Sequence, residues 1–224
     1  MHVYFLRHGE TDWNVKFLYQ GGTDIPLNEN GRQLAVRAGQ GMAQVPFDLL
    51  ITSGLDRAQE TGVLILRENA VCHPENDASA WPAGTPAERG GIRYFTDARL
   101  KEIGFGCWEG LCYKGEGYNL PPHRFASFWD DVNDEDLPAL AETKASLFSR
   151  VHSFFDELAA RYGETDANVL IVSHGGVARA VKYLFGGAAN YVQAATGNCE
   201  VLLLDYAPET GWRVTGQKKS AEQA

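Results

Sequence analysis

The chain has 224 residues, 44% of them hydrophobic and 22% charged, and its 29 acidic and 20 basic side chains give a formal net charge of −9. These values fit a globular protein of one sizeable domain or two small ones, and they exclude a disordered, collagen-like or coiled-coil chain. The acidic balance argues against nucleic acid or an anionic membrane as the main partner, so an anionic substrate would need a local cluster of arginines.

Short apolar runs predict buried strands, in chain order, at residues 3–6, 47–51, 169–172 and 201–204. Apolar residues at helical spacings predict helices within 29–43, 56–67 and 147–162. Strands and helices therefore alternate, which indicates an α/β fold of three layers, α/β/α, with a mostly parallel central sheet. A turn at 208–211 followed by a strand at 211–215 predicts one antiparallel edge strand in a closing hairpin.

Two stretches interrupt this alternation. Residues 73–91 contain three prolines and no periodicity, so they are interpreted as an irregular insertion. Residues 111–140 mix aromatic with acidic side chains. Loops longer than about 15 residues in a compact domain are usually functional lids or disordered, and the aromatic content favours a lid. We therefore predict one domain over residues 1–224 with a lid insertion at about 107–140.

The sequence offers few signals for other locations or chemistries. Its apolar runs are far shorter than the roughly 20 residues that cross a bilayer, and no leader precedes Arg7, so we expect a cytoplasmic protein without a membrane partner. The four cysteines include no C-x-x-C pair, and no metal site is expected. Nucleotide-binding glycine loops, a cysteine-phosphatase loop and a serine-hydrolase elbow are absent from the sequence.

Three predicted strands end in residues suited to an anion. His8 and His174 each follow a buried strand directly, and Arg57 opens the helix after a third strand. The carboxyl ends of parallel strands line one crevice, so these side chains can meet there. One His-Gly pair after a strand is more often a simple turn. Two copies together with Arg7 and Arg57 favour a phosphate pocket, because the guanidinium fork matches phosphate oxygens.

Four motifs follow one another along the chain: Arg7-His8-Gly9-Glu10-Thr11, the segment 53–61, the acidic segment 100–110, and Ser173-His174-Gly175-Gly176. Asn198-Cys199-Glu200 then opens the last long strand. In this order they resemble the motifs of the histidine phosphatase superfamily, also called the phosphoglycerate mutase-like proteins. The resemblance extends over most of the chain.

The resemblance implies phosphoryl transfer without a metal or cofactor, on a small phosphorylated substrate. It makes His8 the nucleophile that takes the phosphoryl group, and Glu102 the general acid and base. It places three further side chains around the phosphate: Arg7, Arg57 and His174. It assigns substrate binding to Asn14, Gln20, Gly21 and Gly175.

Within this family the sequence favours a phosphatase. The mutase branch carries Arg-His-Tyr directly after the acidic residue and an arginine pair further on. Here Glu102 is followed by Ile103, Gly104 and Phe105, and residues 111–140 supply only two cations, Lys114 and Arg124. We therefore expect a phosphomonoester hydrolase that forms a phosphohistidine intermediate.

Two alternatives stay open. One is a cofactor-dependent phosphoryl transfer of the phosphoglycerate mutase type, and the other is a non-catalytic relative that binds a phosphorylated ligand. The presence of His8, Glu102 and His174 argues against the second. Leu18 stands where the family often has a basic residue. This difference affects the expected substrate affinity and leaves the reaction class unchanged.

Overall fold

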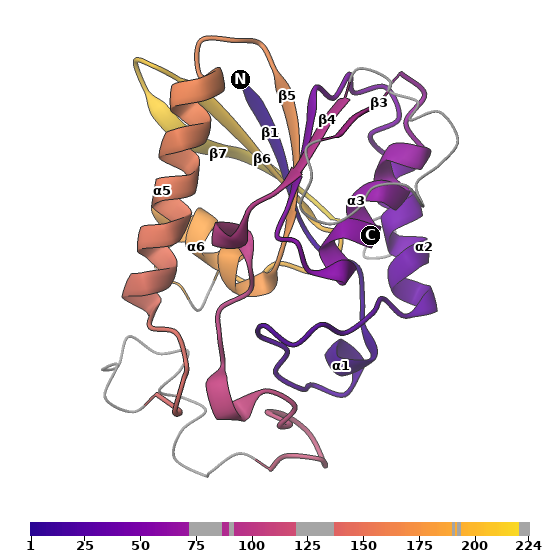
Figure 1. Ribbon diagram of the computed structural model, residues 1–224, viewed down its shortest axis with the longest axis vertical. Coiled ribbons are helices and arrows are strands. Elements are labelled where there is room, and N and C mark those ends of the chain that lie inside the picture. Colours follow the sequence, from indigo (N-terminus) through magenta and orange to yellow (C-terminus); the bar gives the residue numbers. More distant parts are fainter. Residues whose placement is uncertain (72–86, 90–91, 120–136, 190, 192–193, 220–224) are drawn as a thin grey trace.

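The computed structural model describes residues 1–71, 87–89, 92–119, 137–189, 191 and 194–219. A seven-stranded sheet runs through the molecule in the order β3-β4-β2-β5-β1-β6-β7. Its strands are β1 His2–Arg7, β2 Leu49–Thr52, β3 Ala87–Arg89, β4 Ile92–Thr96, β5 Asn168–Ser173, β6 Val201–Ala207 and β7 Gly211–Lys218. Figure 1 shows the sheet between two layers of helices.

The four central strands β4, β2, β5 and β1 are parallel. β6 pairs antiparallel with β1, β7 antiparallel with β6, and β3 antiparallel with β4. The predicted α/β/α layers and the mostly parallel sheet are thus confirmed. Antiparallel pairing occurs toward both edges of the sheet, whereas the sequence predicted it at one edge only.

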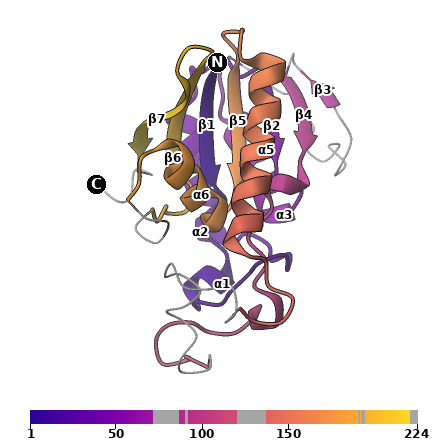
Figure 2. The same cartoon turned by 90° about the vertical axis from the view of Figure 1, so that its left-hand side faces the viewer.

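Helices cover both faces of the sheet. α5 (Lys144–Tyr162) and α6 (Gly175–Phe185) lie on one face, and α2 (Glu29–Gln40) and α3 (Asp56–Arg67) on the other (Figures 1 and 2). Strand residues alternate between these layers: Val3 and Phe5 pack in the core beneath α5 and α6, and Leu6 in the core beneath α2 and α3. Both faces are buried, which is why the central strands read as continuous apolar runs.

Local capping explains where two of the helices begin. The Asn28 side chain accepts a hydrogen bond from the Gly31 amide at 2.7 Å and starts α2. Thr143 does the same for the Ser146 amide at 3.0 Å and starts α5. The bounds of α3 match the predicted segment 56–67.

Several elements of the structure were not predicted, and part of one predicted segment lies outside the described residues. The insertion expected at 73–91 includes β3, and β4 and α6 were not predicted. A short helix α1 (Asp12–Val15) and the 3-10 turns η2 (Ala98–Leu100) and η3 (Gly106–Trp108) lie near the carboxyl end of the sheet. Of the predicted lid, residues 120–136 fall outside the described residues. Among the helices that the structure describes, none is long and apolar enough to cross a membrane.

Candidate active site

Parallel pairing of β1 with β5 brings the two histidine motifs together. Arg7 lies opposite Ser173 at the ends of the paired strands, so His8 and His174 occupy the next position on each chain. The His8 amide donates to the Ser173 carbonyl at 2.9 Å, and the two imidazole rings have centroids 5.1 Å apart. The carboxyl end of the sheet therefore carries both histidines, as the sequence predicted.

A cavity of about 280 Å³ opens at this place. Half of its wall consists of residues predicted for the site: Arg7, His8, Asn14, Gln20, Glu102 and Gly175. The remaining wall residues are Leu18, Tyr19, Phe105, Tyr113, Gly176 and Arg179. Arg57 and His174 lie behind this wall, fully buried.

His8 is held as a neutral imidazole with one defined tautomer. Its side chain is 2% exposed, and Nδ1 lies 2.6 Å from the carbonyl oxygen of Gly9, which can only accept. Nδ1 therefore carries the proton, and Nε2 keeps its lone pair. Burial lowers the pKa of His8 well below 6.5, and the charges of Arg57 and Arg7 lower it further. The ring is thus ready to act as a nucleophile at neutral and mildly acidic pH.

Arg57 connects the base of the site to the loop that follows α1. Its Nη1 donates to the carbonyl of Thr23 at 2.8 Å and its Nη2 to the carbonyl of Gly21 at 2.9 Å. Its backbone carbonyl accepts from Thr61 Oγ1, which in turn accepts from the Gly9 amide at 2.9 Å. The guanidinium of Arg57 thus holds the loop, and its backbone carbonyl holds the chain beside His8 through Thr61.

His174 has an equally buried ring. Its Nε2 lies 2.7 Å from Ser53 Oγ, and Nδ1 has no hydrogen-bond partner among the described residues. Ser53 Oγ also accepts from the Leu55 amide at 3.3 Å. Burial lowers the pKa of His174 well below 6.5, and the charge of Arg57 acts in the same direction. A buried polar atom without a partner is costly, so Nδ1 is suited to a ligand oxygen.

Arg7 lies on the same face of β1 as Val3 and Phe5, the face that packs against α6. Its Nη1 donates to the Thr196 carbonyl at 3.0 Å, and its Nε is buried without a partner among the described residues. A Cβ atom built on Gly175 would lie 3.5 Å from Arg7 Nε. This is an ordinary van der Waals distance, so the guanidinium passes close to the start of α6 and would still do so beside a small side chain.

Glu102 reaches the cavity from the opposite side, after η2. Its Oε1 accepts from the amides of Ile103 at 3.0 Å and Gly176 at 2.8 Å. A Cβ atom on Gly176 would come within 2.4 Å of this oxygen, so only glycine allows the contact. The hydrogen bonds fix the carboxyl group through one oxygen and leave Oε2 for proton transfer.

Two of the remaining predicted residues, Asn14 and Gln20, line the cavity. Asn14 closes the first turn of α1, where its Oδ1 accepts from the Thr11 amide at 3.1 Å. Gln20 is 7% exposed, and its Oε1 has no partner among the described residues. Gly21 does not line the cavity; it has φ +53 and supplies a carbonyl to Arg57. Asn14 and Gln20 thus fit the predicted binding role, whereas Gly21 acts on the loop backbone.

Glu109 fastens this loop to the turn η3. Its Oε1 accepts from the Gly22 amide at 3.0 Å and the Phe105 amide at 3.3 Å, and its Oε2 from the Thr23 amide at 3.0 Å and the Thr23 hydroxyl. The carboxylate is therefore engaged in holding the loop that carries Gln20.

We expect Glu109→Ala to lower the free energy of unfolding by about 2 kcal/mol, because several hydrogen bonds to a charged acceptor are lost. The Michaelis constant should rise as well, since Gln20 loses its support. Urea unfolding and steady-state kinetics measure both effects. Glu116→Ala, at an exposed position close by in the chain, is the control, and equal stability of the two variants would contradict this role of Glu109.

The buried histidines predict how stability depends on pH. The unfolded chain takes up protons on His8 and His174 below about pH 6.5, while the folded chain does not. Stability should therefore fall as the pH drops below 6.5, by up to about 1.4 kcal/mol per pH unit for each histidine. When the free energy of unfolding is measured with urea at several pH values between 7 and 5, it should depend less steeply on pH in His8→Gln than in the wild type. The exposed control His152→Gln should keep the pH dependence of the wild type. The same pH dependence of the free energy of unfolding in all three proteins would contradict the role of the buried His8.

Sequence reasoning missed several contributors to the site. Ser53 and Thr61 lie within the motif at 53–61, yet a hydroxyl gives no sequence signal of which ring or amide it contacts. Arg179 was overlooked because the helix α6 was not predicted. Once α6 is placed, Arg179 follows Gly175 by four residues and must share its face.

Metal binding has no obvious place in the described part of the chain. There, no group of three or more His, Cys, Asp and Glu side chains is arranged to hold an ion. The positive charge of the site comes from arginines.

Comparisons with known proteins agree with the geometry. The model of the histidine phosphatase superfamily (branch 1) matches residues 3–78 and 82–218. A 2,3-bisphosphoglycerate-dependent phosphoglycerate mutase of Pseudoalteromonas atlantica is 31% identical over 79% of this chain and 80% of its own length. A glucosyl-3-phosphoglycerate phosphatase of Mycobacterium tuberculosis is 30% identical over 79% of this chain and 71% of its own.

A solved structure extends the likeness to the fold. The structure of a mycobacterial glucosyl-3-phosphoglycerate phosphatase in complex with VO3 has a TM-score of 0.74 and 25% identity. The match covers 96% of this chain and 97% of that one. Both phosphatases and mutases thus occur among the similar proteins.

Proposed function

We propose that this chain, which belongs to the histidine phosphatase superfamily, hydrolyses small phosphomonoesters through a phosphohistidine intermediate. The superfamily comprises phosphoryl-transfer enzymes, and relatives of this chain include phosphatases and mutases. The observation that carries the proposal is His8, a neutral ring with a defined Nε2 lone pair at the wall of the cavity.

In the first step, Nε2 of His8 attacks phosphorus, and the bond from phosphorus to the leaving oxygen breaks. Arg7 and Arg57 stabilise the charge on the equatorial phosphoryl oxygens. His174 joins them through Nδ1: when the Ser53 hydroxyl donates to Nε2, which lies 2.7 Å away, Nδ1 carries the ring proton and donates to a phosphoryl oxygen. Neutral histidines and charged arginines thus share the phosphate.

Glu102 moves the proton in both steps. Its Oε2 gives a proton to the leaving alkoxide, which departs as an alcohol. The resulting carboxylate takes a proton from the attacking water, whose oxygen bonds to phosphorus as the bond to Nε2 of His8 breaks. Phosphate leaves, and both residues return to their starting states.

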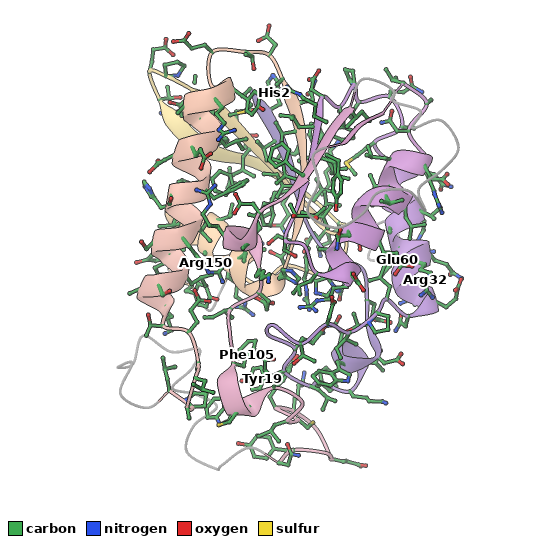
Figure 3. The ribbon with its side chains drawn as sticks, viewed as in Figure 1. His2, Tyr19, Arg32, Glu60, Phe105 and Arg150 are labelled. Atoms are coloured by element: carbon green, nitrogen blue, oxygen red, sulfur yellow. The ribbon has the colours of Figure 1, made fainter. Side chains whose placement is uncertain are left out.

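Hydrolysis is favoured over return of the phosphoryl group to a substrate. A mutase must hold a second acidic group during the transfer. The stretch after Glu102 instead enters the core, with Ile103 fully buried and Phe105 stacked on Tyr19 at a centroid distance of 4.2 Å (labelled in Figure 3). This stretch therefore offers no cation to a second phosphate.

Mutase-type transfer is the second candidate, because a phosphoglycerate mutase is among the similar proteins. Incubation with 3-phosphoglycerate and analysis of the products separates the two. Inorganic phosphate and glycerate as the main products support hydrolysis, whereas 2-phosphoglycerate without phosphate release supports the mutase. Binding without either product would support the non-catalytic relative.

A screen of phosphomonoesters for phosphate release tests the proposal directly. We expect activity to survive an excess of EDTA, because Arg7 and Arg57 supply the charge that a metal would otherwise provide. Arg57→Ala should cost far more activity than Arg124→Ala. Activity that is lost in EDTA and restored by magnesium or zinc would contradict the metal-independent mechanism.

A further inference from the structure

The turn that precedes β6 contacts the chain at the nucleophile. β6 pairs antiparallel with β1, so residues 197–199 lie beside the point where β1 ends. The Cys199 amide donates to the Arg7 carbonyl at 2.9 Å. The side chain of Asn198 donates through Nδ2 to the His8 carbonyl, also at 2.9 Å. A turn from the far end of the sequence therefore holds the backbone of both residues.

This turn is itself firmly anchored. Cys199 has φ +53, a left-handed conformation that is uncommon for residues other than glycine. Such a conformation persists only where the surrounding contacts require it. The buried carboxylate of Glu200 accepts from the Gly197 amide at 2.6 Å and from the side-chain amide of Gln217 on β7. The turn is thus fixed to the sheet, and the side chain of Asn198 projects from a rigid base.

Asn198 also fixes the orientation of a residue in the cavity wall. Its Nδ2, which donates to the His8 carbonyl, lies 3.3 Å from Oδ1 of Asn14. That oxygen accepts from the amide and the hydroxyl of Thr11 as well, each at 3.1 Å. The backbone amide can only donate, so the oxygen of Asn14 must face it. Three donors thus engage Oδ1, and the Nδ2 donor of Asn14 is left for a ligand in the cavity.

We infer that Asn198 is a positioning residue for phosphoryl transfer, whose single NH2 group holds the backbone of His8 and orients the amide group of Asn14. This inference rests on the proposed hydrolase function and deepens it. Attack on phosphorus requires Nε2 of His8 to lie in line with the leaving oxygen, and a small displacement costs much of the rate. Asn198 is not among the described residues that line the cavity, so it acts through its two neighbours.

Substitution of Asn198 tests both contacts. Asn198→Asp keeps the shape of the side chain but replaces the donor by a carboxylate, and Asn198→Ala removes the group without adding charge. Stopped-flow release of nitrophenolate from nitrophenyl phosphate follows the first step and gives its rate constant and substrate affinity. Both variants should lower the rate constant by roughly 10- to 100-fold, because the nucleophile is displaced. They should weaken the affinity by roughly three- to tenfold, because Asn14 no longer presents a fixed donor.

Two comparisons distinguish positioning from a general loss of stability. In the Asn14→Ala background, Asn198→Ala should still slow the first step but should not weaken the affinity further. Asn69 is the matched control, a buried asparagine whose Nδ2 also donates to two backbone carbonyls, those of Met42 at 3.0 Å and Val45 at 2.9 Å. Asn69→Ala should lower the free energy of unfolding and keep the wild-type rate constant and affinity.

The outcomes separate the inference from the proposed function. A wild-type rate constant in Asn198→Asp or Asn198→Ala would overturn the inference, since neither variant can donate to the His8 carbonyl. Affinity losses that add up in the double variant with Asn14→Ala would overturn it too, and so would equal slowing in Asn69→Ala. If the wild type releases no phosphate from nitrophenyl phosphate or from alkyl phosphates, the hydrolase function itself is overturned.

Discussion

His8→Ala is expected to lower turnover of every phosphomonoester that the chain hydrolyses by about 10⁴-fold or more, because the nucleophile of the first step is lost. The fold should persist. His8 lies beyond the end of β1, and the hydrogen bond of its backbone amide to Ser173 does not depend on the side chain. Circular dichroism and urea unfolding check the fold of the variant.

A covalent label makes this prediction specific. Brief incubation with a ³²P-labelled phosphomonoester followed by a quench should leave an acid-labile phosphoryl group on the wild type and none on His8→Ala. His152→Ala, which changes an exposed histidine on α5, is the matched control and should label normally. Wild-type turnover without any label would refute the phosphohistidine mechanism.

Glu102→Gln is expected to lower turnover of alkyl phosphates by about 10²- to 10⁴-fold, because the leaving alkoxide then departs without a proton. The substitution keeps the shape of the side chain, and the amide oxygen can still accept from Ile103 and Gly176. A nitrophenolate leaves readily without a proton. The same variant should therefore lose much less activity on nitrophenyl phosphate.

The dependence of turnover on pH should change in the same variant. The lowered pKa of His8 puts the acidic limb of the wild-type profile well below pH 6.5, since the ring stays neutral down to that pKa. On alkyl phosphates the alkaline side of the profile should change in Glu102→Gln, because the general acid of the first step is lost. The substrate's own second ionisation near pH 6 affects both proteins alike, so the comparison isolates the enzyme.

Glu10→Gln provides the control for this pair of measurements. Glu10 Oε1 accepts from the side-chain amides of Asn28 and Asn30 at 3.0 Å, and Glu10 does not line the cavity. The variant Glu10→Gln should have the same effect on turnover of alkyl phosphates as on turnover of nitrophenyl phosphate. Equal losses of Glu102→Gln on both substrate types would mean that another carboxylate is the general acid.

The sequence predicted the central fold well, because its signals there are strong and local. Apolar runs marked β1 and β5, which are covered on both faces, and amphipathic spacing marked α3 over the range that the structure shows. The placement of His8 and His174 followed from one rule about parallel strand ends. Physical constraints that act within a few residues were therefore sufficient to predict these elements and the place of the two histidines.

Contacts between segments that lie far apart in the chain could not be predicted from the sequence. α6 begins with two glycines directly after His174, a start without the polar cap that usually marks a helix, and so Arg179 was not assigned to the site. The pairing of Ser53 with His174 joins two loops that carry no common pattern. Of the predicted binding residues, Gly21 was assigned to substrate although its carbonyl binds Arg57, because the sequence does not show which way a backbone group points.

The position of β1 between β5 and β6 has a consequence for biosynthesis. β1 leaves the ribosome before the other strands of this sheet, yet its partners begin only at Asn168 and Val201. At typical elongation rates the apolar strand waits on the order of ten seconds for a neighbour, which makes the nascent chain a candidate for chaperone protection. His8 reaches His174 only when β5 has been made and paired. Catalytic competence therefore waits until residues 1–174 have been made and the two strands have paired.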